Sequence, residues 1–368
     1  MTRYLAEAGL PVRMLGRTGN ICHPIGPGSV CGAALYVSAA AASVMAGGPP
    51  GAESPISDIP DVVAHVFLHT PPAVVPHSGL GDAPWWLGEW RESWTREEHA
   101  AAVEAVRAAI ARGDVYQVNV VGHASAPYRG DPGPALARVA ALPGARYGGV
   151  LSAVGAGLSP GGAGLSPGAA GWALATASPE TLVEVRGGRV ITRPIKGTRP
   201  ATEAGRRELL ASAKERAEHV MIVDLERNDL SRLPGVGPVV VEELFAVRRW
   251  CDLWQAESVV SAPVTGRLEL PDLLRALCPG GSVTGAPKRA ALAEIARLEP
   301  VGRGVSMGAL GWVGTDHVDL GLTIRTVAAA RGRVHVWAGG GITWDSDPFA
   351  EVDEAAAKSA PIRSALAG

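Results

Sequence analysis

Apolar and polar positions form a regular pattern only after about residue 93. Residues 1–92 are rich in Gly, Pro and Ala, with short apolar runs such as VVAHVFLH (62–69), so we predict no long element there. A helix is predicted to begin at Thr95, because Glu98 stands three residues after this capping hydroxyl and a periodic Ala/Val run continues to about Arg112. The segment that follows, DVYQVNVVGHA, alternates as a strand does.

Strand patterns continue in the second half of the chain. LVEVRGGRVITRPI predicts a hairpin that turns at Gly187-Gly188. HVDLGLTIRTVAAARGRVHVWAG predicts two strands around an Arg-Gly turn. The near-repeat GLSPGGA, GLSPGAA within residues 152–171 supplies no buried face and predicts an exposed loop.

Helical patterns separate these strands. One helix is predicted over about Glu203 to Leu225 and another over Pro287 to Leu298. The last is predicted to open at Asp347-Pro348, an N-cap residue followed by proline, and to run toward Leu366. Antiparallel strands broken by helices favour the α+β class.

Composition narrows the kind of ligand. The 368 residues are 47% hydrophobic and 19% charged, with a formal net charge of −2, which is typical of a globular protein without the basic field that nucleic acid attracts. Trp85, Trp86, Trp90 and Trp94 lack interleaved basic residues, so we interpret them as a packing cluster. We therefore expect a small-molecule site and no nucleic-acid partner.

The cysteines and one uncharged stretch indicate in which part of the cell the protein is expected. The four cysteines are scattered without a CxxC pair, which favours a reduced, cytoplasmic protein. Residues 30–48 lack charge, but they are mostly Ala, Ser and Gly, which contribute little transfer energy. We expect no membrane association.

Two acidic pairs could hold a metal ion. Glu215 and Glu218 stand three residues apart on a predicted helix, and Glu351, Glu354 and Lys358 share one face of the last helix. If the pairs converge, their oxygens suit Mg²⁺, which takes few protein carboxylates and keeps several waters. Taken alone, each pair is more often a solvated helix face.

Other segments could bind an anion or supply a nucleophile. CPGGSVTGAPK (278–288) places glycines and hydroxyls before a helix, where free N–H groups favour a carboxylate, and it lacks the P-loop spacing. AGGGITWDSD (338–347) is similar, although a tight turn explains it as well. Lys196 in ITRPIKGTRP is either a surface charge or, if desolvated, a nucleophile.

Together these segments resemble one enzyme family. GDVYQVNV, ASPETLVEV, RPIKGTRP, ERAEHVMIVDLERNDL, PGGSVTGAPKRA, LGLTIRT and AGGGITWDSDPFAEVDEAAAK are similar, in order, to motifs of the chorismate-utilising enzymes, which include anthranilate, aminodeoxychorismate, isochorismate and salicylate synthases. They span Gly113 to the C-terminus, about 70% of the chain. The resemblance implies two packed antiparallel β-sheet halves with outer helices. It also implies a shortened N-terminal segment, 1–92, packing on a chorismate-binding catalytic domain, 93–368.

The resemblance also implies roles for particular residues. Glu218 and Glu354 would bind Mg²⁺ directly, and Glu215 and Glu351 would hold its waters. Glu180 would be the general acid on the departing hydroxyl. The residues implied to bind substrate are Gln117, Thr198, Gln255, Ser282, Thr284, Arg325, Gly340, Gly341 and Lys358.

Two positions separate the branches of this family. Isochorismate and salicylate synthases carry a water-activating lysine where this chain has Gln117, so water is not the expected nucleophile. Anthranilate synthases have alanine where this chain has Lys196, and PIKGT is similar to the aminodeoxychorismate branch, which serves 4-aminobenzoate and folate synthesis. In that branch the lysine attacks C2 of chorismate, the 4-hydroxyl leaves, and ammonia then enters at C4. Anthranilate or 2-amino-2-deoxyisochorismate synthesis is the alternative.

Some positions depart from the family pattern. Gln255 stands where many relatives have histidine, and Ser306 stands where an aromatic residue is usual. These departures and the short N-terminal segment keep a catalytically inactive chorismate-binding subunit as a third hypothesis. No cysteine lies in a glutaminase motif, so ammonia is expected from a glutamine amidotransferase subunit, with the subsequent aminodeoxychorismate lyase a separate protein.

Overall fold

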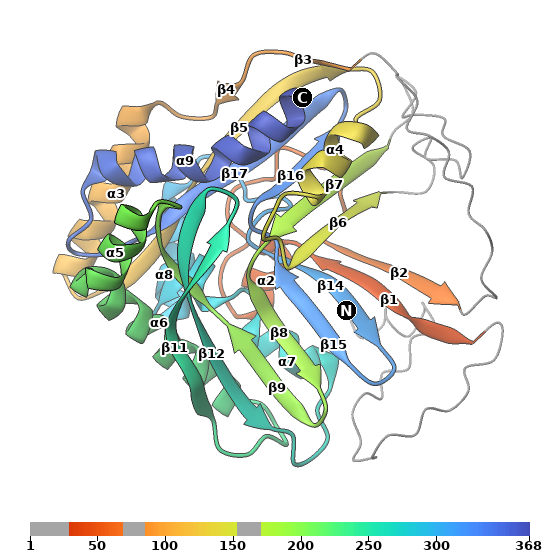
Figure 1. The fold of residues 1–368 in the computed structure, drawn as a ribbon, viewed down its shortest axis with the longest axis vertical. Helices are drawn as coiled ribbons and strands as arrows, with labels where there is room; N and C mark the ends of the chain where they lie inside the picture. The colour runs from red at the N-terminus through yellow and green to blue at the C-terminus, as the bar shows by residue number, and fades with distance from the viewer. Residues whose placement is uncertain (1–28, 69–84, 153–170) are drawn as a thin grey trace.

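Two antiparallel sheets form the centre of the molecule. The computed structural model describes residues 29–68, 85–152 and 171–368 (Figure 1). Across these residues the larger sheet has the order β10-β12-β9-β8-β15-β14-β1-β2, with β11 paired to β12. Its strands are β1 (Val30–Val37), β2 (Val62–Leu68), β8 (Thr181–Arg186), β9 (Arg189–Arg193), β10 (Ile195–Pro200), β11 (Val240–Trp250), β12 (Leu253–Pro263), β14 (Ala309–Gly314) and β15 (Val318–Leu322).

The smaller sheet has the order β13-β5-β17-β16-β7-β6, and two short strands, β3 and β4, pair with β5. Its central pair is β5 with β17, in register from Val118 opposite Ile342 to Pro127 opposite Arg333. Its strands are β3 (Trp86–Leu87), β4 (Arg91–Glu92), β5 (Gln117–Arg129), β6 (Tyr147–Ser152), β7 (Trp172–Ser178), β13 (Gly285–Ala286), β16 (Thr326–Ala330) and β17 (Arg333–Ile342).

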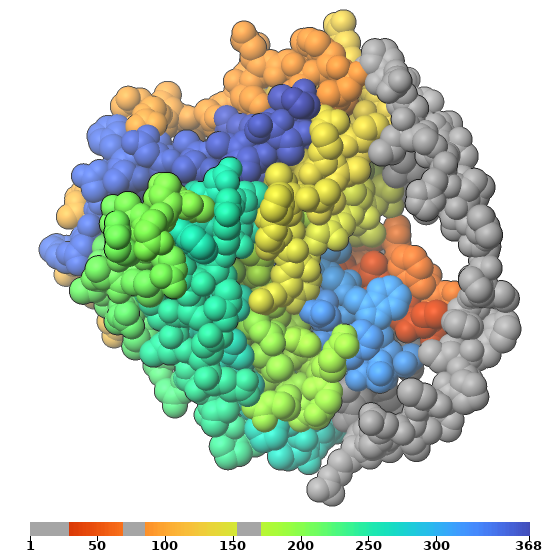
Figure 2. All heavy atoms as spheres, in the orientation of Figure 1, coloured from red at the N-terminus to blue at the C-terminus, as the bar shows by residue number. Residues whose placement is uncertain are grey.

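Apolar side chains of the two sheets share one core. Leu174 and Ala328 of the smaller sheet belong to the same buried cluster as Val183 and Leu320 of the larger sheet. Much of β11 is exposed at the surface (Figure 2), and helices cover other parts of the outside (Figure 1). They are α2 (Ala39–Met45), α3 (Arg96–Ala111), α4 (Gly133–Ala140), α5 (Glu203–Ala211), α6 (Ala213–Ser231), α7 (Leu270–Leu277), α8 (Lys288–Leu298) and α9 (Pro348–Ala367). The expected α+β fold of two packed antiparallel sheets with outer helices is confirmed.

Helix-capping residues and turn residues in the sequence predicted several elements correctly. Thr95 and Glu98 form both hydrogen bonds of the predicted capping box before α3. Asp347 caps α9 by accepting a hydrogen bond from the Ala350 N–H. Gly187 and Gly188 adopt left-handed φ values of 57° and 73° at the predicted hairpin turn. The predicted loop at 152–171 lies almost entirely outside the described residues.

Three predictions of secondary structure were wrong. The helix predicted over 203–225 is two helices, because Ser212 takes an extended conformation and caps α6 by accepting from the Glu215 N–H. The segment predicted as two strands contains three, since the chain breaks after β15 and Arg325 adopts a left-handed φ of 53°. Residues 29–68 form β1, α2 and β2, because β1 pairs with β14, far away in the sequence.

Trp85, Trp90 and Trp94 pack against the protein, as we interpreted the tryptophan segment, whereas Trp86 is 49% exposed. Trp85 stacks on Tyr128 with ring centroids 5.3 Å apart, and Trp94 stacks on His99 at 4.5 Å. The uncharged stretch 30–48 forms β1 and the short helix α2. Among the described residues no helix has the length and apolar character needed to cross a membrane.

Candidate active site

One pocket gathers most of the residues that the sequence singled out. It lies where β10, β12 and β17 approach α6, α9 and the short 3₁₀ turn at Gly281–Val283. The predicted residues that line it are Glu180, Lys196, Thr198, Glu215, Glu218, Gln255, Ser282, Arg325, Gly341, Glu351, Glu354 and Lys358. Segments that are far apart in the sequence therefore converge on one site.

Ser282 joins the predicted nucleophile to the predicted acid. Nζ of Lys196 donates to the backbone carbonyl oxygen of Ser282 at 3.0 Å. The hydroxyl of Ser282 donates to Oε1 of Glu180, and the Ile195 N–H donates to the same oxygen at 3.3 Å. The 3₁₀ turn thus places an amine and a carboxyl group on one short hydrogen-bonded path.

Burial tunes the proton affinity of both groups. Removal from water raises the pKa of Glu180 to about 7, although the hydrogen bonds from Ser282 and Ile195 act in the opposite direction. Removal from water lowers the pKa of Lys196, and the charge of Lys358 lowers it further, against the attraction of Glu218. Glu180 is thereby suited to hold a proton near neutral pH, and Lys196 to release one.

Gln117 and Lys196 meet at Gly341. A Cβ atom built on Gly341 would lie 2.5 Å from Nζ of Lys196 and closer still to Nε2 of Gln117. Both polar atoms of the Gln117 amide are buried and lack a hydrogen-bond partner within the described residues. The two positions that are expected to separate the family's branches are therefore neighbours, and glycine at 341 leaves them the space.

Four carboxylates from two helices face the same pocket. Glu215 and Glu218 come from α6, and Glu351 and Glu354 come from α9. Burial, together with the nearby charge of Glu354, raises the pKa of Glu351. Burial would also raise the pKa of Glu354, but attraction to Lys358, 2.6 Å away, outweighs it and lowers that pKa.

Protein cations contact each of these carboxylates. Arg199 lies 2.9 Å from Glu215, and Lys214 lies 3.8 Å from both Glu218 and Glu351. Within the described residues no three acidic, histidine or cysteine side chains are gathered closely enough to hold a metal ion as they stand. The donor set is nevertheless chemically suited to Mg²⁺, because carboxylate oxygens are the hard ligands that this ion takes.

Arg325 supplies a positive group at the other side of the pocket. Its guanidinium lies over the ring of Trp250, 4.0 Å from the centroid, and its Nη1 has no hydrogen-bond partner among the described residues. Arg325 adopts a left-handed φ of 53°, which costs energy for any residue but glycine. A buried, strained and incompletely bonded arginine is typical of a site for a carboxylate.

The remaining predicted residues have different positions. Thr198 and Gln255 are cross-strand partners of β10 and β12 and both line the pocket. Gly340 lies behind it, where a Cβ atom would approach Oε2 of Glu351 to 2.8 Å. Thr284 does not line this pocket: its hydroxyl donates to the carbonyl of Gly280 at 2.8 Å and holds the turn.

Sequence reasoning missed several lining residues. Lys214, Asn119, Met307 and Trp337 all line the pocket. Lys214 stands directly before Glu215 in the KERAEH motif, so its place one turn before Glu218 could have been inferred. Met307 and Trp337 reach the site only through the packing of the two sheets, which leaves no local signal.

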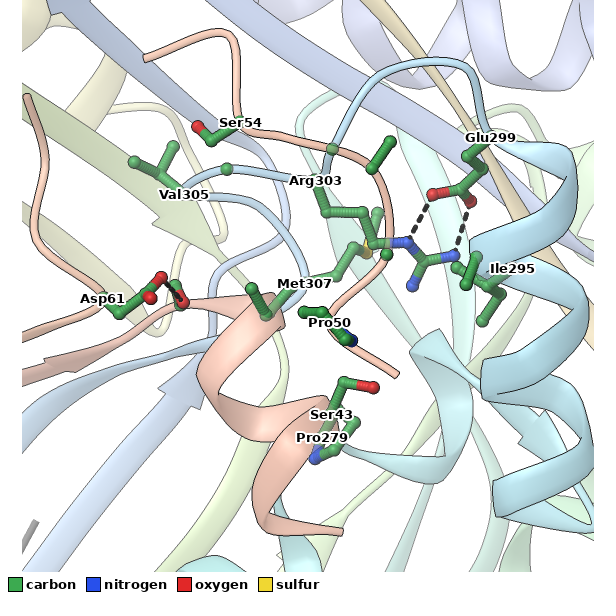
Figure 3. A pocket seen from close by; sticks show the side chains of 18 of the residues that line it. Ser43, Pro50, Ser54, Asp61, Pro279, Ile295, Glu299, Arg303, Val305 and Met307 are labelled. Atoms are coloured by element: carbon green, nitrogen blue, oxygen red, sulfur yellow. Dashed lines mark hydrogen bonds and ion pairs between the residues drawn. The ribbon is translucent and has the colours of Figure 1, made fainter. Parts of the chain in front are cut away.

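A second cavity shares Met307 with this pocket (Figure 3). The buried pair Arg303 and Glu299, joined at 2.7 Å, lies along it. Arg303 also donates to the backbone carbonyls of Val283 at 2.6 Å and Asn119 at 2.8 Å. Because Val283 and Asn119 line the active-site pocket, this ion pair fixes the backbone beneath it.

Comparison with known proteins gives the same assignment. Residues 61–364 match the family described as chorismate binding enzyme. Anthranilate synthase component 1 of Streptomyces coelicolor is 39% identical over 284 residues, covering 75% of this chain and 53% of that protein. Aminodeoxychorismate synthase component 1 of Klebsiella aerogenes is 37% identical over 272 residues, covering 72% of this chain and 57% of that protein. The chain thus spans little more than half the length of these curated relatives.

Solved structures agree in fold. The crystal structure of anthranilate synthase component I from Streptococcus pneumoniae has a TM-score of 0.73 at 25% identity, with 97% of this chain and 85% of that chain covered. MenF, the menaquinone-specific isochorismate synthase of Escherichia coli, has a TM-score of 0.63 at 19% identity, with 78% and 64% covered, and supports the fold alone. The motifs, the two-sheet fold and the converging site residues all agree with these matches, and the chain belongs to the family of chorismate-binding enzymes.

Proposed function

We propose that the protein aminates chorismate at C4 to give 4-amino-4-deoxychorismate, with Lys196 as a transient covalent nucleophile. The observation that carries the proposal is the buried amine of Lys196, 3.0 Å from the Ser282 carbonyl and linked through Ser282 to Glu180. A lysine can attack carbon only when neutral, and burial favours the neutral form. The anthranilate branch is expected to have alanine at this position and so to lack the nucleophile.

The first step displaces the 4-hydroxyl of chorismate. The neutral amine of Lys196 forms a bond to C2, the ring double bonds shift, and the C4–O bond breaks. Glu180 gives its proton to the departing oxygen, which leaves as water. A pKa of about 7 keeps much of Glu180 protonated near neutral pH, as a general acid requires.

The second step reverses the shift of the ring double bonds. Ammonia forms a bond to C4, the double bonds return, and the C2–N bond to Lys196 breaks. The entering nitrogen loses a proton after it has bound to C4. This proton passes to the protein and restores its starting protonation state. Covalent capture thus divides one difficult substitution into two easier ones.

The charged groups around the pocket would hold the substrate. Arg325, whose Nη1 has no hydrogen-bond partner among the described residues, would bind a carboxylate of the substrate. Lys358, which contacts Glu354 at 2.6 Å, would also bind the substrate. Glu218 and Glu354 would bind Mg²⁺ directly, with Glu215 and Glu351 holding its waters. Bound Mg²⁺ would neutralise and orient the ring carboxylate of chorismate.

Ammonia is proposed to come from a separate glutamine amidotransferase. The support is the name "component 1" of the relatives, which are similar to this chain over most of its length. Among the described cysteines, Cys278 is unsuited to glutaminase chemistry, since burial raises the pKa of its thiol to about 12. A partner protein would therefore supply the nitrogen.

Anthranilate synthesis is the second candidate. The observation in its favour is the 39% identity to the anthranilate synthase component of Streptomyces coelicolor, against 37% for the aminodeoxychorismate relative. The two reactions use the same substrate, metal and nitrogen source, so these identities do not separate them. Lys196 is the residue that favours C4 amination.

Product analysis tests the proposal. Purified protein is incubated with chorismate, Mg²⁺ and ammonium at mildly alkaline pH, alongside Lys196→Ala, and the products are identified by chromatography and mass spectrometry. The proposal expects aminodeoxychorismate from wild type and its loss in the variant. Anthranilate or aminodeoxyisochorismate from wild type would transfer the protein to the second candidate. No turnover, even with an added amidotransferase, would favour an inactive binding subunit.

A further inference from the structure

Glu226 is a buried carboxyl group of α6 that has no part in the reaction steps proposed above. Its exposed fraction is 3%. Buried residues of α6 recur at intervals of three or four positions, as on one face of a helix. They include Glu215, His219, Ile222, Glu226 and Asp229. The buried face that begins at Glu215 beside the active site therefore continues to Glu226.

Both oxygens of Glu226 have a hydrogen-bond donor. Oε1 accepts from the backbone N–H of Gly281 at 3.1 Å, and Oε2 accepts from the hydroxyl of Thr192 at 3.2 Å. Burial of a carboxyl group without such partners is costly. Gly281 is the first residue of the 3₁₀ turn that carries Ser282. Glu226 thus joins α6 to the turn beside the active site.

This turn lies directly against α6. A Cβ atom built on Gly281 would lie 3.1 Å from Oε1 of Glu226 and closer still to the side chain of the preceding leucine. Glycine therefore lets the backbone of the turn approach the helix closely enough for the hydrogen bond. Arg303 holds the other end of the turn by donating to the Val283 carbonyl at 2.6 Å. The residue between these two contacts is Ser282.

Charged groups influence the proton affinity of Glu226 but leave its contacts possible. Asp229 pairs with Lys288 of α8 at 2.7 Å. Burial, the charge of Asp229 and that of Glu180 raise the pKa of Glu226, while Lys288 and the Gly281 N–H act in the opposite direction. Oε1 can accept from Gly281 whether or not the group is protonated, since a protonated carboxyl group keeps an acceptor oxygen.

We propose that Glu226 is a positioning residue, which fixes the turn against α6 and so aligns the hydroxyl of Ser282 with Glu180. This role rests on the proposed function, in which Glu180 is the general acid. The path is short: Glu226 accepts from Gly281, and the next residue, Ser282, donates to Glu180. Without the contact to Glu226, the turn moves away from α6 and the Ser282 hydroxyl leaves its acceptor.

The same helix carries Glu218, a proposed ligand of Mg²⁺. Glu226 stands eight positions after Glu218, which is about 12 Å along a helix that rises about 1.5 Å per residue. The contact at Glu226 therefore places the turn at a set distance from the proposed metal site. The acid and the metal ion are proposed to act on one substrate, and a displacement of about 1 Å can lower such a rate about a hundredfold.

Glu226→Leu and Glu226→Gln separate the hydrogen bond from the charge. Both remove the charge, so its effect on the pKa of Glu180 is common to the two variants. The glutamine side chain can still accept from Gly281 and donate to Thr192, whereas the leucine side chain can do neither. Loss of the Ser282 contact raises the pKa of Glu180. The alkaline limb of kcat is therefore expected to lie roughly one pH unit higher in Glu226→Leu than in Glu226→Gln.

A double substitution shows whether the effect passes through Ser282. In Ser282→Ala protein the two Glu226 variants should have the same alkaline limb, because the hydroxyl that Glu226 aligns is absent. A purely structural role would lower the melting temperature and leave the limb in place. The limb is read on whichever product chorismate gives, so an unexpected product would contradict the proposed function alone. Equal limbs for the two variants with Ser282 present would overturn the role of Glu226.

Amide hydrogen exchange tests the contact without turnover. Peptides that contain residues 279–284, followed by mass spectrometry without chorismate, should exchange about tenfold faster in Glu226→Leu than in wild type. Glu226→Gln should exchange at the wild-type rate. Asp224→Leu, at an exposed position of α6 paired with Arg227, is the matched control and should match wild type in both measurements.

A shorter side chain provides a second variant of the same kind. Glu226→Asp keeps a carboxyl group that cannot reach Gly281, and it should show the same faster exchange if Glu226→Leu does not fold. Wild-type exchange of residues 279–284 in these variants would overturn the proposal, even for a protein that does not turn over chorismate.

Discussion

Nζ of Lys196 and the carbonyl oxygen of Ser282 lie 3.0 Å apart, and the hydroxyl of the same serine donates to Glu180. This arrangement would make Ser282 a positioning residue for both of the groups proposed to react. Its backbone orients the amine, and its side chain stabilises the charged form of the acid. The two effects can be separated, because substitution removes only the hydroxyl.

Ser282→Ala is predicted to move the alkaline limb of the pH–rate profile upward. The hydroxyl lowers the pKa of Glu180, so its removal raises that pKa and keeps Glu180 protonated to higher pH. A hydrogen bond to a charged group corresponds to a shift of roughly one pH unit. The measurement is kcat against pH with saturating ammonium, and Ser282→Thr should restore the wild-type limb. A profile that does not move would contradict a general-acid role for Glu180.

Glu180→Gln is predicted to abolish turnover and to stabilise the protein at alkaline pH. The pKa of Glu180 in the folded state is about 7, above its ordinary value of 4.5, so the folded state binds more protons between these values. Stability from this group is therefore lost as pH rises from 4.5 to 7, by about 3 kcal/mol in total. Urea unfolding at pH 5 and pH 8 measures this effect. The free energy of unfolding of the variant, relative to that of wild type, should be higher at pH 8 than at pH 5. Glu97→Gln, on the exposed face of α3, is the control and should show no such gain.

Gly341→Ala is predicted to reduce activity strongly at a moderate cost in stability. The added methyl group would overlap the positions of the Gln117 amide and Nζ of Lys196 and displace both. Overpacking of this kind costs about 1–3 kcal/mol. Gly149→Ala is the matched control, because no atom lies within 4 Å of its Cβ position. Equal turnover and equal melting temperatures for the two variants would refute the close approach.

Lys214→Met is predicted to tighten Mg²⁺ binding. The Lys214 ammonium lies 3.8 Å from a carboxylate oxygen of Glu218 and of Glu351, where it competes with a metal ion for both. Because this side chain is partly exposed, solvent reduces the effect to a roughly three- to tenfold gain in affinity. Isothermal titration with Mg²⁺ measures it without reference to turnover. Arg227→Met, on an exposed part of α6, is the control, and weaker binding in Lys214→Met would show that the lysine supports the metal site.

The sequence predicted most of the site because its residues stand in short ordered motifs. Glu215 and Glu218 follow helical spacing, and the cap at Asp347 sets the phase of Glu351 and Glu354 on α9. The hairpin at Gly187-Gly188 and the capping box at Thr95 are likewise local. These features depend on a few neighbouring residues, which the sequence displays directly.

The features that the sequence did not predict depend on distant contacts. β1 is a strand because β14 and β2 pair with it, although its own residues are mainly small. The break at Arg325 results from a left-handed backbone that no local pattern indicates. Thr284 stands in the predicted anion-binding segment, but its hydroxyl is turned toward Gly280. Side-chain direction in a 3₁₀ turn cannot be read from spacing.

The most direct test of the central claim is intact-protein mass spectrometry without a nitrogen source. Protein is mixed with chorismate and Mg²⁺ in ammonia-free buffer, quenched, and digested for peptide mapping. The account predicts an adduct with the mass of chorismate less one water on the peptide that contains Lys196, its disappearance on addition of ammonium, and its absence from Lys196→Ala. Production of aminodeoxychorismate by the Lys196→Ala variant at the wild-type rate, with no adduct on the wild-type protein, would contradict the covalent role of Lys196.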